Sequence, residues 1–338
     1  MITEQVTTTD LNEFCWCSEH PQDDRAHDPA QKLDLALEER IHDALWKDAV
    51  LRATDISEID VHVKNGIVYL RGHLLSGNNR QRVEKALQEV DGIPGIRSSF
   101  VMDEDLKYQI AMSLAQLEQA NQCKFFTGVS HGVVVLNGEV PSASVRLSAE
   151  LCAASNPKVR GVINYIHITG ETPALDDTRF LQPPIGKEIC FLDGVHGIVR
   201  QVVISPGNRR VTAMTIQGRF LSLNENSSTL NSGPMRPVLQ VLLIPMNVVG
   251  HLTNSSGFLT IPSSDNKNIQ NFDAHQFVAP GKGWEPPYPY CPQDVLFPVE
   301  HQQVDKGFEN LSSQISPTLK VEEQVLSKQL LTNDSLGG

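Results

Sequence analysis

The chain contains an internal repeat, and this repeat constrains the fold more than any other feature of the sequence. Residues 63–102 align with residues 129–168 without a gap at a constant offset of 66, and nine of the 40 aligned positions are identical. Self-similarity over this length indicates one supersecondary unit that has been duplicated. We therefore expect two similar modules, at residues 35–104 and 105–168.

Each copy has the pattern of two helices and three strands. In the first copy, apolar residues recur at three- and four-residue spacing over 37–45 and again over 83–90, which predicts two amphipathic helices. Alternating β-branched residues on both sides of Asn65-Gly66 predict a hairpin with a two-residue turn, and His131-Gly132 takes the same place in the second copy. A third strand closes each copy, so the expected order is α-β-β-α-β.

Six glycines of the repeat are interpreted as residues that the backbone conformation requires. A tight hairpin turn and a close approach of two strands both favour a residue without Cβ. We assign these structural roles to the matching glycines of the two copies, namely Gly66, Gly72, Gly95, Gly132, Gly138 and Gly161.

The repeated element V-x-x-G-[IV]-V-x-L-x-G resembles the BON domain family, which is named for bacterial osmotic-stress and nodulation proteins. The resemblance covers residues 35–168 as a tandem pair. It implies α/β modules that bind phospholipid surfaces or partner proteins, and it implies no catalytic residues.

After residue 183 the sequence pattern changes to short apolar strands separated by turns. Six strand-like segments lie within 184–261, and a small antiparallel set of this size is expected to hide its edges in a closed β-barrel. The polar, breaker-rich stretch 222–237 is expected to be an exposed, mobile loop. The predicted fold class is therefore multi-domain, with two α/β modules and one all-β domain.

Residues 184–261 also resemble a PRC-barrel, a family found in the reaction-centre H subunit and in ribosome-maturation factors. The marks of the resemblance are Gly186, Asp193, Gly194, Gly197 and Pro245. The family's Asp-Pro-x-Thr-Gly turn is replaced here by Ser205-Pro206-Gly207-Asn208-Arg209, which lacks the acid. The resemblance implies no pigment or metal bound through these residues.

Charge is unevenly distributed along the chain. With 40 acidic and 28 basic side chains the formal net charge is −12. Residues 1–34 carry 8 acidic and 2 basic groups and residues 262–338 carry 10 and 5, whereas residues 184–261 carry 3 and 6. Such a polyanion gains nothing on average from nucleic acid or an anionic membrane, so only a locally basic face would bind either.

The two ends and the stretch 169–183 are expected to be linkers and tails. We interpret residues 1–34 as an acidic disordered tail and 262–338 as a Pro-rich, largely disordered tail with a marginal helix over 319–331. The longest apolar stretch, 238–249, falls well short of the roughly 20 residues of a transmembrane helix. No secretory signal is visible, which favours the cytoplasm, where the six cysteines would be mostly reduced thiols.

Few residues have the spacing of a metal or catalytic site. Cys15 and Cys17 with His20 form the one concentrated ligand cluster, but no second cysteine pair lies nearby, so a flexible acidic tail is the favoured interpretation. Single histidines on or beside strands are expected to be surface or hydrogen-bonded residues, and the remaining thiols to be small core residues. These are His62, His73, His131 and His167, and Cys123, Cys152 and Cys190.

No nucleophile elbow, phosphate loop or dinucleotide fingerprint occurs in the sequence. Arg209 and Arg210 are candidates for anion binding in a barrel turn, although a solvated turn is the favoured interpretation.

The sequence thus predicts a non-enzymatic binding or scaffold protein without cofactor or metal. It would act as an adaptor, cytoplasmic or peripheral to the inner membrane face, that recognises a phospholipid surface or a protein assembly by the sum of several weak contacts. The alternative is an RNA- or ribosome-associated factor acting through the barrel, whose affinity would fall steeply with salt. An enzyme would need acid, base and nucleophile groups converging in one pocket.

Overall fold

The structure is a computed structural model that describes residues 29–171, 179–221, 237–253 and 256–299. The predicted mobile loop at 222–237 lies almost entirely outside these residues, as do the helix expected over 319–331 and the Cys15, Cys17 and His20 cluster. The described chain begins with a helix at Pro29, so the expected disordered tail does not extend through residue 34. Of the described residues, those up to 272 together with 279–296 form one compact unit, and residues 273–278 with 297–299 form another.

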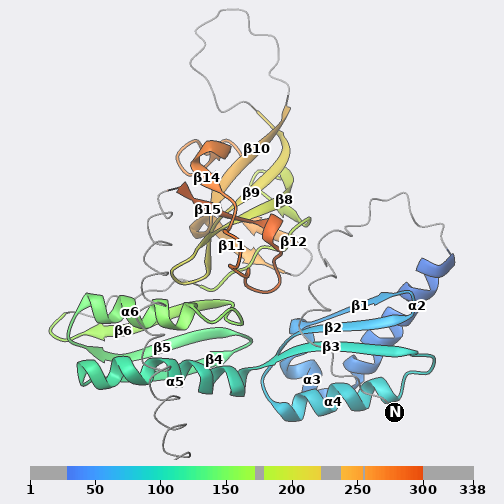
Figure 1. The fold of residues 1–338 in the computed structure, drawn as a ribbon. Coiled ribbons are helices and arrows are strands. Elements are labelled where there is room, and N and C mark those ends of the chain that lie inside the picture. Colours follow the sequence, from blue (N-terminus) through green and yellow to red (C-terminus); the bar gives the residue numbers. More distant parts are fainter. Residues whose placement is uncertain (1–28, 172–178, 222–236, 254–255, 300–338) are drawn as a thin grey trace, which may run out of the picture. The chain divides into compact units, whose positions relative to one another are not determined.

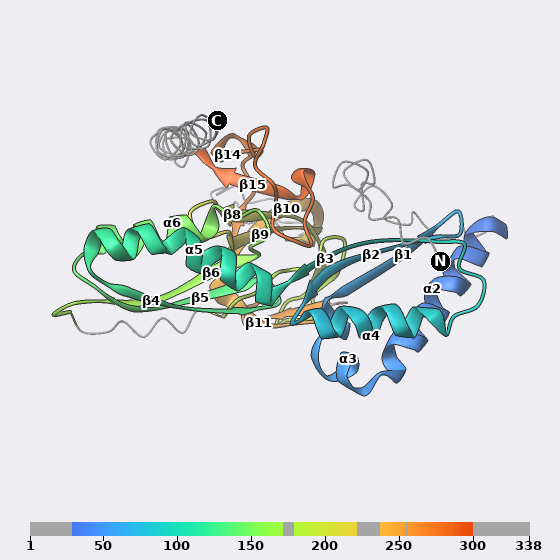
Figure 2. The same cartoon turned by 60° about the horizontal axis from the view of Figure 1, so that its bottom comes forward.

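Module 1 has the predicted α-β-β-α-β order, with its first helix broken in two (Figure 1). Its sheet order is β1-β2-β3, in which β1 and β2 are antiparallel and β2 and β3 are parallel. Figure 2 shows α4 on the same face of the sheet as α2 and α3. The elements are α2 (Pro29–Lys47), α3 (Ala49–Thr54), the 3₁₀ turn η1 (Ile56–Glu58), β1 (Ile59–Lys64), β2 (Ile67–Leu74), α4 (Gly77–Gln88) and β3 (Gly95–Met102).

Module 2 repeats this architecture and follows β3 without a linker. Its sheet order β4-β5-β6 has the same antiparallel and parallel pairings. From the second strand of the hairpin onward, the two strands and the helix of module 2 lie 66 residues after their counterparts in module 1. The elements are α5 (Asp103–Asn121), β4 (Lys124–Ser130), β5 (Val133–Val140), α6 (Ala143–Ala154) and β6 (Gly161–Ile168).

Each module has its own core between its helices and one face of its sheet. In module 1 the predicted helical stripe Leu37, Ile41 and Leu45 is buried against Val68 and Leu70. The equivalent core of module 2 contains Leu106, Ile110 and Leu114 with Val134 and Leu136. Burial of these apolar surfaces stabilises each module, and the helical periodicity of the sequence predicted which side faces the core.

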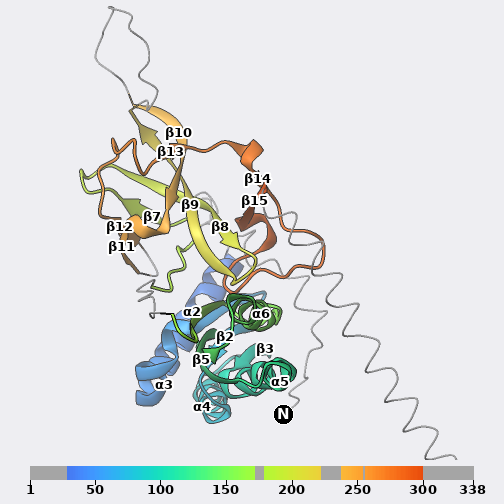
Figure 3. The ribbon, with the colours of Figure 1, turned by 90° about the vertical axis from the view of Figure 1, so that its left-hand side faces the viewer.

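The second half of the chain forms a β-domain with all six predicted strands (Figure 3). The order is β11-β12-β7-β8-β9-β10-β13. Among the described strands this path ends at β11 and β13, so the closed barrel that we expected is not shown. The strands are β7 (Glu188–Cys190), β8 (His196–Ser205), β9 (Arg210–Phe220), β10 (Val238–Pro245), β11 (Val249–Leu252) and β12 (Ser256–Leu259), with the 3₁₀ turn η2 (Met246–Val248).

Residues 262–299 differ from the Pro-rich, largely disordered tail that we expected there. They contain β13 (Gln270–Asn271), η3 (Ala274–Gln276), β14 (Phe277–Val278), η4 (Pro292–Asp294) and β15 (Val295–Pro298). Val295 of β15 pairs in parallel with Val202 of β8, and Tyr290 is buried. In the smaller compact unit, Phe277 and Val278 pair with the last two residues of β15. Buried aromatic and β-branched residues therefore hold a proline-rich segment in place.

Candidate functional site

A carboxylate on the first helix of each module holds the hairpin turn of that module. Asp34 accepts hydrogen bonds of 2.8 Å from the backbone N–H groups of both Asn65 and Gly66. In module 2, Asp103 accepts from the N–H groups of His131 and Gly132 in the same way. Burial raises the pKa of Asp103. Sequence reasoning missed this pair, because the helices align at an offset of 69 whereas the strands align at 66.

The three-residue difference places an extra turn in module 1 that reaches module 2. Asp55 in this turn is fully buried and accepts hydrogen bonds from Asn79 at 2.5 Å and from the backbone N–H of Leu75 at 3.3 Å. Its Oδ1 also lies 3.0 Å from Nε2 of His131 in module 2. The hydrogen bond to Asp55 raises the pKa of His131. The hairpin turn of module 2 is thereby joined to module 1.

We call the contacts of Asp55 and Glu58 with His131 and Arg160 the joint between the modules. The side chain of Arg160 contacts several segments of the chain at this joint. Its guanidinium donates to Glu58 of module 1, to the carbonyl oxygen of His131 at 3.0 Å, and to Oε1 of Gln182 at 2.6 and 3.0 Å. It also lies 5.3 Å from the centre of the Tyr288 ring. One cation thus connects both modules to two later segments of the chain.

His73 is the buried histidine of the joint. Its Nε2 lies 2.9 Å from the carbonyl oxygen of Lys158, which can only accept, so this nitrogen carries the proton. Among the described residues, Nδ1 has no hydrogen-bond partner. Burial lowers the pKa of His73 to about 4, and the ring is therefore neutral at neutral pH.

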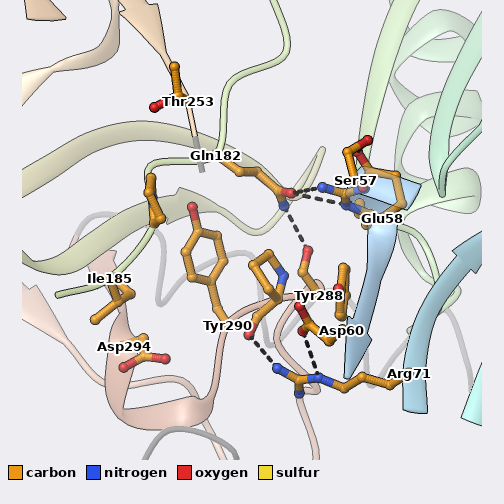
Figure 4. Close-up of a pocket in the computed structure, with 13 residues that line it drawn as sticks. Ser57, Glu58, Asp60, Arg71, Gln182, Ile185, Thr253, Tyr288, Tyr290 and Asp294 are labelled. Atoms are coloured by element: carbon orange, nitrogen blue, oxygen red, sulfur yellow. Dashed lines mark hydrogen bonds and ion pairs between the residues drawn. The ribbon is translucent and has the colours of Figure 1, made fainter. Parts of the chain in front are cut away.

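A pocket of about 360 Å³ lies beside this joint (Figure 4). Arg71 pairs with Asp60 at 3.2 Å and donates to the carbonyl oxygen of Pro289 at 3.4 Å. The Tyr288 ring has Arg71 at 5.2 Å and Arg160 at 5.3 Å from its centre. The lining residues are Ser57, Glu58, Asp60, Arg71, Arg160, Gln182, Pro184, Ile185, Thr253, Tyr288, Pro289, Tyr290 and Asp294.

The chemistry of the pocket is that of compensated charge. Both arginines are paired with carboxylates of module 1. Burial raises the pKa values of Tyr288 and Tyr290 well above the ordinary tyrosine range, so both hydroxyls stay protonated at neutral pH. Tyr290 donates its hydroxyl to the carbonyl oxygen of Pro183 at 3.0 Å. Within the described residues no group of three His, Cys, Asp or Glu side chains is placed to hold a metal ion.

We call residues 284–294 the strap, because their backbone is held by side chains from several elements. Gln182 donates to the carbonyl oxygen of Tyr288 at 2.9 Å, and Gln201 donates to that of Gln293 at 3.1 Å. Arg209 donates to the carbonyl oxygen of Glu285 at 2.7 Å. The strap therefore serves as an internal peptide that connects the β-domain and the modules.

Arg209 is not the exposed anion-binding residue that we considered together with Arg210. Arg209 is 2% exposed, and besides Glu285 its guanidinium donates to the carbonyl oxygens of Val159 at 2.6 Å and Pro157 at 3.1 Å. It lies 4.9 Å from the centre of the Trp284 ring. Burial lowers its pKa to about 10, so it remains charged at neutral pH. Arg210 donates to the carbonyl oxygen of Arg179 at 3.1 Å.

The predicted structural glycines divide into constrained and unconstrained positions. The turn glycines Gly66 and Gly132 have φ values of 77° and 75°. A Cβ at Gly72 or Gly138 would collide with the carbonyl oxygen of Glu58 or Lys124. A Cβ at Gly161 would meet the side chain of Phe180, and a Cβ at Gly197 would meet that of Ile216. Gly95 has open space around it and no such constraint. Gly186 and Gly194 have positive φ, and Pro245 ends β10.

Asp193 and the cysteines have structural roles. Asp193 accepts hydrogen bonds from the backbone N–H of Val195 at 3.3 Å and from Ser263 at 2.9 and 2.7 Å, which ties the predicted turn to a later segment. Cys123, Cys152 and Cys190 carry free thiols, as expected, and burial raises the pKa of the first two. Among the described cysteines, Cys291 differs from the expected reduced thiols, because it is disulfide-bonded.

The open faces of the two module sheets, opposite the helices, differ in chemistry. In module 2 this face presents Phe126 and Tyr165, which are 66% and 38% exposed, with Val135 and Ile163 in the adjacent cross-strand row. At the same four positions module 1 has Asp60, Ser99, Tyr69 and Arg97. Arg97 lies 5.8 Å from the centre of the Tyr69 ring. Module 1 thus uses this face to line the pocket, whereas module 2 exposes an apolar surface.

Two segments of the chain, residues 34–104 and 128–170, match the family model of the BON domain. This finding agrees with the resemblance drawn from the repeated glycine element. The comparisons do not show a PRC-barrel in residues 184–261. No curated protein matches the chain.

The similar solved structures include two of CdsD, a structural protein of the type III secretion system of Chlamydia trachomatis. The first is 16% identical with a TM-score of 0.34, and the match covers 42% of this chain and 65% of that one. The second, of the C-terminal domain, is 16% identical with a TM-score of 0.33, and the match covers 40% of this chain and 66% of that one. This chain thus spans slightly less than two thirds of either CdsD chain.

Proposed function

We propose that this chain is a non-enzymatic adaptor that binds a phospholipid surface through its tandem BON modules. The observation that carries the proposal is the exposed apolar face of module 2. The β-domain, for which we retain the proposal of a PRC-like architecture, would be carried to the membrane with the modules. No helix among the described residues is long and apolar enough to span a bilayer, and the proposed contact is peripheral.

The face of module 2 has an ordered chemical pattern across its three strands. One cross-strand row is Phe126, Asn137 and Tyr165, and the next is Gly128, Val135 and Ile163. The row on the other side of Phe126 is charged, with Lys124, Glu139 and His167. Apolar and aromatic side chains beside a lysine suit the boundary between headgroups and acyl chains, since aromatic rings enter the interface while the ammonium stays in water.

The pocket supports a binding role better than a catalytic one. The carboxylates of Glu58 and Asp60 are paired with guanidiniums, that of Asp294 accepts from the backbone N–H of Cys291, and the tyrosines stay protonated at neutral pH. A general base needs a pKa near the working pH and a free path to the substrate proton. The lining residues contain no histidine or cysteine that would serve as base or nucleophile.

The alternative of RNA association was based on the excess of basic side chains in the β-domain. Arg209 does not contribute to such a basic surface. Arg209 is buried and its described hydrogen bonds go to backbone carbonyls, so it cannot also meet a phosphate.

Co-sedimentation of the full chain with vesicles tests the proposal. The chain should bind vesicles of phosphatidylcholine with phosphatidylglycerol, and Phe126→Ser with Tyr165→Ser should weaken binding about tenfold or more, because two inserted rings are lost. The matched control is Tyr108→Ser with Met112→Ser, which removes two exposed apolar side chains from α5 instead of the sheet. Absence of vesicle binding, or equal loss in both double variants, would refute the proposal.

A further inference from the structure

The β-domain has a groove of its own on the outer side of β8, β9 and β10. We call it the β8–β10 groove, and its volume is about 670 Å³. The groove lies on one sheet, and none of its lining residues also lines the pocket beside the joint. The side chains that give the groove its chemistry are His196, Ile198, Arg200, Gln217, Arg219 and Leu239.

Strand register explains how these side chains come to share one surface. Ile198 is opposite Gln217, and Arg219 is opposite Leu239. Beneath them, Gly197 pairs with Gly218, and a Cβ on either glycine would come within 3.1 Å of the Phe220 ring. The two glycines therefore let a buried ring pack close under the sheet and leave a hollow on its outer side.

The arginines enter the groove from opposite directions along the strands. Arg200 follows Ile198 on β8, whereas Arg219 follows Gln217 on the antiparallel strand β9. Arg200 uses Nε to donate to Oε1 of Gln217 at 2.7 Å, which leaves its terminal NH₂ groups for another acceptor. Arg219 is exposed and makes no hydrogen bond or ion pair with the rest of the described chain. An anion lying over Ile198 and Gln217 would meet guanidiniums on both sides.

Exposed apolar side chains surround the same end of the sheet. Leu239 is 68% exposed beside Arg219, and Val238 and Leu221 are exposed next to it. Leu192, 70% exposed, lies in the turn that leads into β8. Single exposed leucines are ordinary, but four large apolar residues at one sheet end with two arginines form an amphipathic surface.

We infer that the β8–β10 groove is a second phospholipid contact, in which Arg200 and Arg219 hold headgroup phosphates of an anionic membrane while Leu239 and its apolar neighbours enter the interface. The inference rests on the proposed function and names the part of the β-domain that takes part in it. Charge complementarity identifies the occupant, because residues 184–261 carry an excess of basic groups in a chain whose net charge is −12. The apolar residues stand at an open sheet end, which suits a broad surface better than a narrow peptide.

The test uses the full chain, anionic vesicles and two double variants with equal loss of charge. Arg200→Gln with Arg219→Gln should weaken binding to phosphatidylcholine–phosphatidylglycerol vesicles about 30-fold, since each cation at an anionic surface contributes to the free energy of binding. The control is Arg80→Gln with Arg82→Gln, two exposed arginines on α4, which should change binding less than threefold. Leu239→Ser should weaken binding to the same vesicles without changing the dependence on salt. Circular dichroism and thermal unfolding like those of the wild type would exclude misfolding.

The outcomes separate this inference from the proposed function. If the wild-type chain binds vesicles and the Phe126 and Tyr165 variant loses binding, while the Arg200 and Arg219 variant binds like the control, the groove assignment is overturned and the proposed function stands. The groove would then be left to an acidic protein partner. If the wild-type chain does not bind, both fall together. A selective loss in the Arg200 and Arg219 variant supports the assignment.

Discussion

Removing the guanidinium of Arg209 should open the contact between module 2 and the turn that precedes β9, to which the strap is also bonded. Arg209→Met keeps an unbranched side chain but cannot donate. The three carbonyl oxygens of Pro157, Val159 and Glu285 would lose donors at 3.1, 2.6 and 2.7 Å, and the Trp284 ring would lose its cation. Hydrogen bonds to a charged donor contribute about 1.5–3 kcal/mol each.

The net effect is smaller than the sum of these contacts, because the substitution also removes the cost of burying the charge. Leaving buried carbonyl oxygens without donors costs about 1–3 kcal/mol each, and after the removed cost of burying the charge we expect about 3–5 kcal/mol in total for Arg209→Met. The chain has several domains, so one unfolding midpoint would not isolate the effect. Amide hydrogen exchange at Val162 is a local reporter, since its N–H donates to the carbonyl oxygen of Asn208 at 2.8 Å.

Exchange at Val162 should accelerate roughly a hundredfold to a few thousandfold in Arg209→Met. Arg210→Met is the matched control, because Arg210 occupies the next position and donates to the carbonyl oxygen of Arg179 from the surface. We expect a change below about 1 kcal/mol there. Exchange that is no faster in Arg209→Met than in Arg210→Met would refute the assignment of Arg209 as the residue that holds this contact.

Two further perturbations follow from the modules. Gly72→Ala should destabilise module 1 by about 2–5 kcal/mol in urea unfolding, because a Cβ there meets the Glu58 carbonyl at a φ of 141°. Gly95→Ala should stay within about 0.5 kcal/mol, and similar losses for both would contradict this account. The pKa of His73 is lowered to about 4, so the unfolded chain binds the proton more tightly; stability from this residue is present above about pH 6.5 and falls as the pH drops toward 4. His73→Gln should reduce the loss of the free energy of unfolding between about pH 6.5 and 4, measured by urea unfolding at each pH. An unchanged pH dependence would show that His73 does not cause this loss.

Local patterns were sufficient to predict the order of helices and strands in the modules, although not the break in the first helix of module 1. Asn65-Gly66 and His131-Gly132 take the positive φ values that a two-residue turn needs, and the hairpins occur where expected. The six β-domain strands also lie where short apolar runs meet turns. Each of these features depends on residues within a few positions of one another, so neighbouring chemistry is enough to specify it.

The candidate site could be anticipated only in part. A comparison of the open sheet faces at an offset of 66 would have shown that Phe126 replaces Asp60 and that Asn137 replaces Arg71. A gapped comparison at 69 would have paired Asp34 with Asp103. The strap had no such signal, because its composition is that of a linker and its order comes from partners more than 75 residues away, as in the bonds from Arg209 to Glu285 and from Gln182 to Tyr288.

The sequence by itself determined the repeat, the helix and strand order and the apolar sides of the helices, since these follow from periodicity and turn chemistry along the chain. Tertiary structure alone decided that Arg209 faces inward to three carbonyls while Arg200 and Arg219 stay exposed. The same side chain can serve as a buried clamp or a surface cation. Which one it becomes depends on the distant groups that replace its water, and their positions are not encoded within any local stretch of the sequence.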